Sequence, residues 1–156
     1  MMTKINPMTI ALNEAEKAGK NGEIPVGAVV YSPKAKEVIA KAGNQVEAMQ
    51  NPLYHAEMIA INEACKKLGI KTLDDLDIYV TLEPCSLCAS AISLVRLKRL
   101  YFGAYDAKSG GVVHGAKIFQ NKSCHFRPEV YGGIEEQRAS SLIKDFFAKI
   151  RALKNE

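Results

Sequence analysis

The sequence is poor in several features that define special classes of protein. No stretch approaches the roughly 18 consecutive apolar residues of a membrane-spanning helix, and residues 1–8 lack the apolar run of a secretory signal. Glycine and proline are not in excess, and the chain contains neither repeats nor low-complexity tracts. These absences exclude fibrous and largely disordered proteins. We therefore expect one globular domain over residues 1–156, in the cytoplasm and without a membrane partner.

Cysteine is scarce, and the charge balance is only mildly basic. Four cysteines in a chain without a secretory signal point to metal binding or catalysis before disulfides. The formal net charge of +4 fits an anionic partner only weakly. Basic side chains gather at Arg96, Lys98 and Arg99, and again at Lys144, Lys149, Arg151 and Lys154. Before any motif is considered, a solvated helix face is the simpler explanation of both groups.

Hydrophobic periodicity and turn residues predict alternating helices and strands. Helices are expected over residues 7–19, 55–68, 84–95 and 135–153, and strands over residues 25–31, 38–42, 77–82, 99–105 and 129–131. Asn6 and Pro7 suit the start of the first helix, whereas residues 44–54 have no clear period and are expected to form a loop. The order indicates an α/β sandwich, partly parallel, with a hairpin at one edge. Its functional residues should follow the carboxyl ends of strands.

Cys85 and Cys88 form the first motif that carries chemistry. Two cysteines three residues apart on a helix share one face, so both sulfurs can reach one ion. We place Pro84 at the first helical position, which would direct the positive helix end at the thiols and favour thiolate. By itself, Cys-x-x-Cys could equally be a redox pair, half of a structural zinc site or a chance pair.

His55 and Glu57 favour a catalytic zinc site among the interpretations of the cysteine motif. Alone, His55 would more readily be a buried imidazole, and Glu57 a first-turn charge that complements a helix dipole. With Cys85 and Cys88, however, His55 completes three ligands, and the fourth tetrahedral position is left for water, as in catalytic zinc sites. Zinc lowers the pKa of such a water toward about 7. Glu57 could then accept its proton and deliver it to a ring nitrogen and to the leaving amine.

His-x-Glu followed by Pro-Cys-x-x-Cys is the signature of zinc-dependent nucleobase deaminases. From about Leu12 to Arg151 the chain resembles the bacterial tRNA-specific adenosine deaminases. The segments that carry this resemblance are 23–30, 79–88, 101–110 and 145–147 with Arg151. Residues 111–114 and the surroundings of Ser90 depart from the family pattern.

This resemblance implies a fold, an activity and a set of contacts. The fold would be a cytidine deaminase-like three-layer α/β/α sandwich with a central mixed five-stranded sheet. The activity would be deamination of adenosine to inosine at the wobble position of a tRNA anticodon, by a homodimer with one zinc ion per subunit. Asn44 would bind the purine, and Val26, Gly27 and Ala28 would line its pocket, with Ala56 and Pro84 in the same site. Asp106, Lys108, Phe146, Phe147 and Arg151 would contact the anticodon loop.

Simpler roles remain open for several of these residues. Asn44 could be a turn residue after Gly43. Phe146 and Phe147 point to different sides of a helix, so one of them should lie in the core. Cys65 is expected in the core. The pair Cys124 and His125 suggests a second metal site, although further ligands are missing.

Two other functions also fit the zinc motif. One is a deaminase of a free nucleobase or nucleoside such as cytosine or guanine, which the motif itself does not exclude. The other is a non-catalytic zinc module that binds RNA, which would require a fourth protein ligand in place of water.

Overall fold

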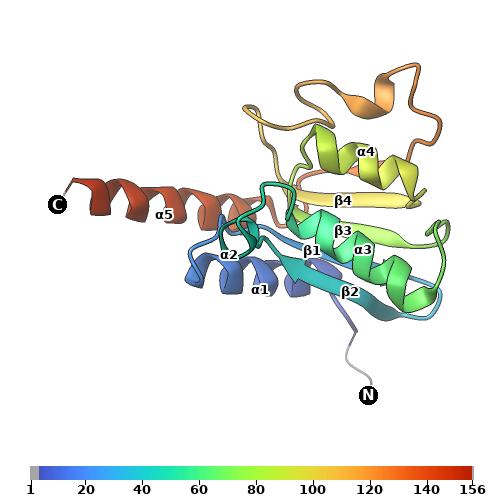
Figure 1. Cartoon of the computed structure of the whole chain (residues 1–156), viewed down its shortest axis with the longest axis horizontal. Coiled ribbons are helices and arrows are strands. Elements are labelled where there is room, and N and C mark those ends of the chain that lie inside the picture. Colours follow the sequence, from blue (N-terminus) through green and yellow to red (C-terminus); the bar gives the residue numbers. More distant parts are fainter. Residues whose placement is uncertain (1–3, 156) are drawn as a thin grey trace.

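The computed structural model describes residues 4–155, so the expectation for residues 1–8 falls partly outside it. A five-stranded sheet lies between two layers of helices (Figure 1). Its strands are β1 (Gly27–Ser32), β2 (Glu37–Gly43), β3 (Asp77–Leu82), β4 (Arg99–Ala104) and β5 (Glu129–Tyr131), in the order β2-β1-β3-β4-β5. β1 is antiparallel to both of its neighbours, whereas β3, β4 and β5 are parallel. The predicted mixed sheet with a hairpin at one edge is thus confirmed.

Two hydrophobic cores hold the three layers together. On one face, α1 (Pro7–Lys20) and α5 (Glu136–Lys154) pack on the sheet, and Met8, Leu12 and Ala139 are buried there. On the other face lie α3 (Ala56–Leu68) and α4 (Ser86–Leu94). β1 serves both cores, because Val29 belongs to the first and Val30 to the second, as the alternation of side chains along a strand requires. Among residues 4–155 no helix is both long and apolar enough to span a bilayer.

The start of α1 follows the predicted capping chemistry. The Asn6 side chain accepts hydrogen bonds from the backbone N–H groups of Met8 and Thr9 at 3.2 and 3.4 Å, and Pro7 occupies the first turn. Gly69 ends α3 in the left-handed conformation, with φ of 66°.

Three local predictions need correction. The loop at 44–54 contains a short helix, α2 (Val46–Met49), because the buried Glu23 carboxylate accepts hydrogen bonds from the backbone N–H groups of Glu47 and Ala48. Pro84 is not the first residue of α4, since Cys85 is the extended N-cap residue and Ser86 begins the helix.

The third correction concerns the two phenylalanines of α5, neither of which lies in the core. Only Ala139 is buried in this helix. The outer half of α5 projects beyond the sheet (Figure 1), so no second layer covers it.

The strand directions bring four chain segments to one end of the sheet. β3 finishes at Leu82, beside the end of β4 at Ala104. Since β1 runs the other way, its start at Gly27 lies at this same end, paired with the last residue of β2, Gly43. The segments that precede β1 and follow β2, β3 and β4 are therefore neighbours, as sequence analysis expected for a site of this fold.

Close packing at the start of β1 leads to the first prediction. A Cβ atom on Gly27 would overlap the backbone oxygen of Ala11 and lie 2.8 Å from the nitrogen of Ala15, both in α1. Gly27→Ala should therefore force β1 and α1 apart and lower the free energy of unfolding by about 3 kcal/mol. Urea denaturation followed by circular dichroism measures this change.

The matched control is Gly69→Ala, where a Cβ atom would meet nothing within 4 Å. Only the left-handed backbone of that residue then opposes the substitution, at a cost of about 1 kcal/mol. Equal stabilities for the two variants would contradict the packing argument.

Candidate active site

His55, Cys85 and Cys88 meet at the end of the sheet where these segments converge. The Nδ1 atom of His55 lies 3.6 Å from the sulfur of Cys85 and 3.4 Å from that of Cys88. All three ligand atoms lie within 4.8 Å of one another, and they form the one such cluster among residues 4–155. The structure thus brings together the three residues that the sequence analysis grouped.

The position of each ligand follows from how its helix begins. His55 is the N-cap residue of α3 and Cys85 that of α4, both with an extended backbone. Neither side chain caps its own helix, so both remain available to the site. Cys88 follows within the first turn of α4. The Asn44 side chain instead accepts the backbone N–H of Ala56 at the start of α3, at 2.8 Å.

The protonation of the two thiols depends on their proximity. The hydrogen bond from Cys88 lowers the pKa of Cys85 to about 4, against the opposing effect of burial, and His55 adds to this lowering. The same sulfur–sulfur contact, with burial, raises the pKa of Cys88. The hydrogen bond to Cys85 raises the pKa of His55, although burial opposes it. The two thiols therefore differ, since the pKa of Cys85 is lowered and that of Cys88 is raised.

The donor set consequently fits a divalent metal ion. Two sulfurs and one imidazole nitrogen form a mixed set of the kind that zinc prefers. The amino ends of α3 and α4 add partial positive charge that favours thiolate. No fourth His, Cys, Asp or Glu joins the cluster within the described part of the chain, so one coordination position remains for water or substrate.

Glu57 lies beside this cluster in the first turn of α3 and is only 4% exposed. Burial raises the pKa of its carboxyl group, which the neighbouring His55 partly offsets. A carboxyl group with a raised pKa can both accept and donate a proton near neutral pH. This is the property that a proton carrier next to an acidified water requires.

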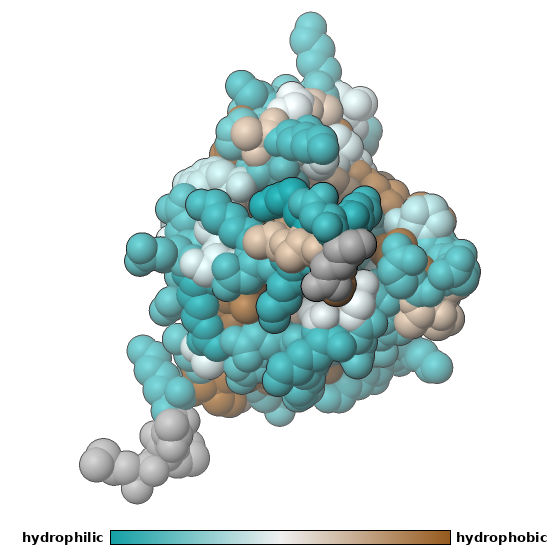
Figure 2. Space-filling view, turned by 90° about the vertical axis from the view of Figure 1, so that its left-hand side faces the viewer, coloured by the Kyte–Doolittle hydropathy of each residue, from teal (hydrophilic) through white to brown (hydrophobic). Residues whose placement is uncertain are grey.

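A cavity of about 890 Å³ opens over the cluster, with His55, Glu57 and Cys85 in its lining. Most of the substrate residues expected from the resemblance also line it: Val26, Asn44, Asp106, Lys108, Phe147 and Arg151. The side chain of Asn44 donates to the backbone oxygen of Ile24 at 3.1 Å, so it is fixed at the cavity edge. Figure 2 views the side from which α5 projects, and hydrophilic residues dominate that surface.

Five expected substrate residues do not line the cavity. Gly27 faces α1, and Ala28 and Ala56 are wholly buried in the core. Pro84 is buried behind Cys85, where its carbonyl oxygen accepts the N–H of Gly111 at 2.8 Å. Phe146 is partly buried on α5, against Phe147.

Sequence analysis missed Glu83 and Tyr105, which also line the cavity. Glu83 directly follows β3, and its side chain is completely buried. Burial opposes its ionisation, yet hydrogen bonds from His114 and from backbone N–H groups lower its pKa below the ordinary value. The sequence did offer one signal for Glu83, namely an acidic residue between a buried strand and the Pro-Cys motif. Its role was not predictable, because the hydrogen-bond partners of Glu83 lie 23 to 31 residues away in the sequence.

The remaining cysteines do not form a second metal site in the described chain. Cys124 is buried, with its sulfur 3.1 Å from the backbone oxygen of Phe126, and the exposed His125 lies beside it. Both line a separate cavity of about 490 Å³ that includes none of the zinc-motif residues. Cys65 packs partly buried against the core, and burial raises its pKa. We therefore take the cavity of about 890 Å³, which His55, Glu57 and Cys85 line, as the candidate active site.

Comparison with known proteins places this site in a family. Residues 1–104 match the family model of the cytidine and deoxycytidylate deaminase zinc-binding region. A tRNA-specific adenosine deaminase of Rickettsia bellii is 50% identical over 144 residues, which cover 92% of this chain and 99% of the relative.

Solved structures agree with this placement. One, from a study of A-to-I editing by tRNA:A34 deaminases at the wobble position of transfer RNA, matches with a TM-score of 0.84 and 43% identity. It covers 87% of this chain and 97% of its own. A guanine deaminase of Nitrosomonas europaea has a TM-score of 0.79 at 18% identity, over 91% of this chain and 83% of its own, and shares the fold alone. The chain belongs to the cytidine and deoxycytidylate deaminase family and, within it, to the tRNA-specific adenosine deaminases.

Proposed function

We propose that this protein hydrolyses adenosine to inosine at the wobble position of a tRNA anticodon, with release of ammonia. The observation that carries the proposal is the buried Glu57 carboxyl beside the His55, Cys85 and Cys88 cluster, at the base of a cavity open to solvent. The relatives named tRNA-specific adenosine deaminase support the substrate. An enzyme acting on tRNA is expected to work in the cytoplasm.

The zinc ion would be held by Nδ1 of His55 and the sulfurs of Cys85 and Cys88, with one ion per chain. When bound, it supplies a water molecule that loses its proton near neutral pH. Glu57 takes that proton and delivers it to a ring nitrogen of adenine as the water oxygen bonds to C6. It then takes the proton of the new C6 hydroxyl group and transfers it to the exocyclic amine, so that the C6–N bond breaks, ammonia departs and the C6 carbonyl of inosine forms. The raised pKa of Glu57 suits both halves of this cycle.

The cavity edge offers partners for a purine that has left the base stack. Asn44 retains one amide N–H beyond its bond to Ile24, and Val26 provides an apolar wall. Gly27, Ala28, Ala56 and Pro84 would support these contacts from behind. A base in an anticodon loop is extruded more easily than one in a duplex, because it is already unstacked in part.

The rest of the anticodon loop would lie along the segment after β4 and along α5. Asp106 and Lys108 line one side of the cavity, and Phe147 and Arg151 another. Phe147 is 38% exposed and, with Phe146, could stack on unpaired bases. The exposed Arg151 of α5 would approach phosphates, as would the exposed Lys144, Lys149 and Lys154.

Exposed apolar side chains on α4 support a homodimer. Leu87 and Leu94 are seven residues apart on this helix, hence on one face of it, and are 39% and 79% exposed. An apolar helix face that is open to solvent suits association with a partner. We take this partner to be a second copy of the chain.

The substrate assignment predicts a clear order of activities. Inosine should form on tRNA, whereas ammonia release from free guanine, cytosine or adenosine should be at least about 100-fold slower, because those substrates lack the contacts along α5 and the 106–109 turn. Nucleoside analysis of digested tRNA measures inosine formation, and a coupled assay measures ammonia release from the free substrates. Faster turnover of a free base than of tRNA would overturn the assignment.

The proton-carrier role predicts the behaviour of Glu57→Gln. This variant should lose at least about 100-fold in turnover and keep its zinc, because the amide cannot carry the proton. Cys88→Ala should instead lose the zinc, as measured by metal analysis of the purified protein. Glu63→Gln, a change at an exposed position on α3, is the control and should match the wild type in turnover and in zinc content. Near-normal turnover of Glu57→Gln would contradict the mechanism.

The dimer predicts a mass of twice the chain mass in light scattering. Leu94→Lys should shift the protein toward the monomer, since it places a charge on the apolar surface of α4. Leu153→Lys, at a comparably exposed position on α5, should leave the dimer intact. A monomeric wild-type protein would refute the proposal.

A further inference from the structure

We propose that Glu83 is a positioning residue that fixes the segment 106–114 and so presents Asp106, Lys108 and Ser109 to the substrate. The inference rests on the proposed function, because it concerns how that substrate is held. It starts from a carboxylate that is completely buried yet lies directly at the cavity, between β3 and the zinc ligand Cys85.

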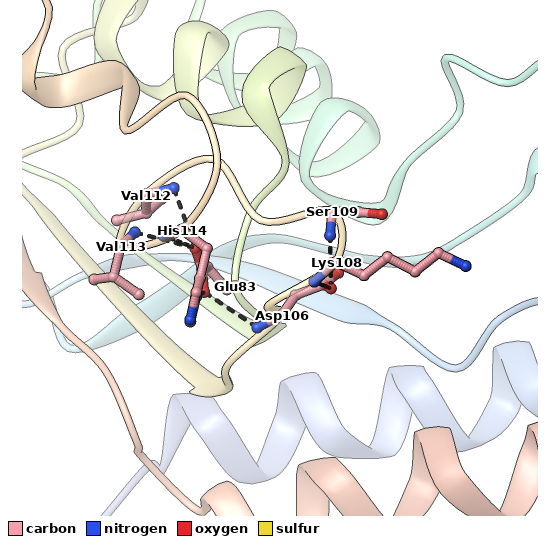
Figure 3. Close-up of polar contacts among 7 residues, drawn as sticks. All are labelled: Glu83, Asp106, Lys108, Ser109, Val112, Val113 and His114. Carbon is pink, nitrogen blue, oxygen red and sulfur yellow. Dashed lines mark hydrogen bonds and ion pairs between the residues drawn. The ribbon is translucent and has the colours of Figure 1, made fainter.

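The Glu83 carboxylate joins both ends of this segment (Figure 3). One oxygen, Oε1, accepts the backbone N–H of Asp106 at 3.1 Å and lies 2.8 Å from Nδ1 of His114. The other, Oε2, accepts the backbone N–H groups of Val112, Val113 and His114 at 3.2, 3.0 and 3.0 Å. A single side chain thus closes residues 106–114 into a loop of fixed shape.

Glycines inside the loop allow this close approach. The backbone of Gly110 packs directly on the Glu83 carboxylate, and that of Gly111 packs on Cys85 and Ser86, so a Cβ atom at either position would collide. The loop is therefore held against the same chain segment that carries the zinc ligands. Its position relative to the reaction centre is set by Glu83.

The fixed loop in turn orients the groups that face the cavity. The Asp106 side chain accepts the backbone N–H groups of Lys108 and Ser109 at 3.2 and 2.9 Å, which forms a tight turn. Lys108 and Ser109 are exposed and line the cavity. Since both Glu83 oxygens are already occupied by protein donors, Glu83 acts through this turn and not by touching substrate.

His114 completes the arrangement from the solvent side. Its ring packs edge-on against Tyr105, with centroids 6.3 Å apart, and Tyr105 packs against Phe102 in the core. The loop is therefore secured by an imidazole contact in addition to four backbone donors.

Glu83→Gln tests the proposal, because it keeps the shape but replaces one acceptor oxygen by an NH₂ group that faces backbone donors. We expect the KM for tRNA to rise about tenfold or more, kcat to change less than about threefold, and zinc content to stay at the wild-type value. Hydrogen exchange should show faster exchange of the Val112–His114 amides.

A double-mutant cycle with Lys108→Ala separates positioning from general loosening. If Glu83 acts by presenting Lys108, the Lys108→Ala change should raise KM less in the Glu83→Gln background than in the wild type. Fully additive effects, an unchanged KM, or loss of zinc in Glu83→Gln would each overturn the proposal.

His114→Ala is a milder second variant that leaves the four backbone hydrogen bonds to Glu83 in place. It should raise the KM for tRNA by a smaller factor in the same direction and keep the zinc, and an unchanged KM would count against the loop-holding role of the imidazole contact. A wild-type protein without activity on tRNA would refute the proposed function itself. A wild-type protein active on tRNA, with Glu83→Gln equally active, would refute only the role of Glu83.

Discussion

The site depends on one geometric constraint, the meeting of the amino ends of α3 and α4 at one end of the sheet. Each helix begins with an N-cap residue, His55 or Cys85, whose side chain serves the cluster and not its own helix. The partial positive charge of both helix ends then falls on two thiols and a buried carboxyl. The capping that α3 thereby forgoes is supplied from outside, by Asn44. A residue expected to bind the purine therefore also fixes the helix that carries His55 and Glu57.

Three buried glutamates, Glu23, Glu57 and Glu83, have different hydrogen-bond partners and different roles in the structure. Glu23 and Glu83 are buried, but each accepts backbone N–H groups from a segment outside the sheet, α2 for the first and residues 106–114 for the second. Such hydrogen bonds stabilise the ionised form, and they lower the pKa of Glu83 despite its burial. For Glu57 burial dominates and its pKa is raised. Glu83, whose pKa is lowered, thus anchors residues 106–114, whereas Glu57, whose pKa is raised, lies beside the His55, Cys85 and Cys88 cluster.

The sequence predicted those parts of the molecule whose causes are local. β3 and β5 were predicted with the bounds that the structure has, because their apolar residues and flanking turns lie within a few positions. The metal cluster was predicted because its residue types imply a shared ion wherever the chain places them. Glu23 and Glu83 were missed because their partners lie more than twenty residues away. The same non-local bonds created α2, where propensity alone predicted a loop.

The centre of the site and the edge of the cavity differ in how they could determine which substrate this fold accepts. The sheet and its covering helices are shared with a guanine deaminase at only 18% identity, so this scaffold does not by itself select a base. In this chain the groups at the cavity edge lie on residues 106–109 and on the outer half of α5, and none of these residues is buried. α5 is anchored chiefly by Ala139, while Phe147 and Arg151 reach the cavity from its projecting half. Substitutions of these exposed residues would alter recognition at little cost in stability, because His55, Glu57, Cys85 and Cys88 are positioned by the starts of α3 and α4.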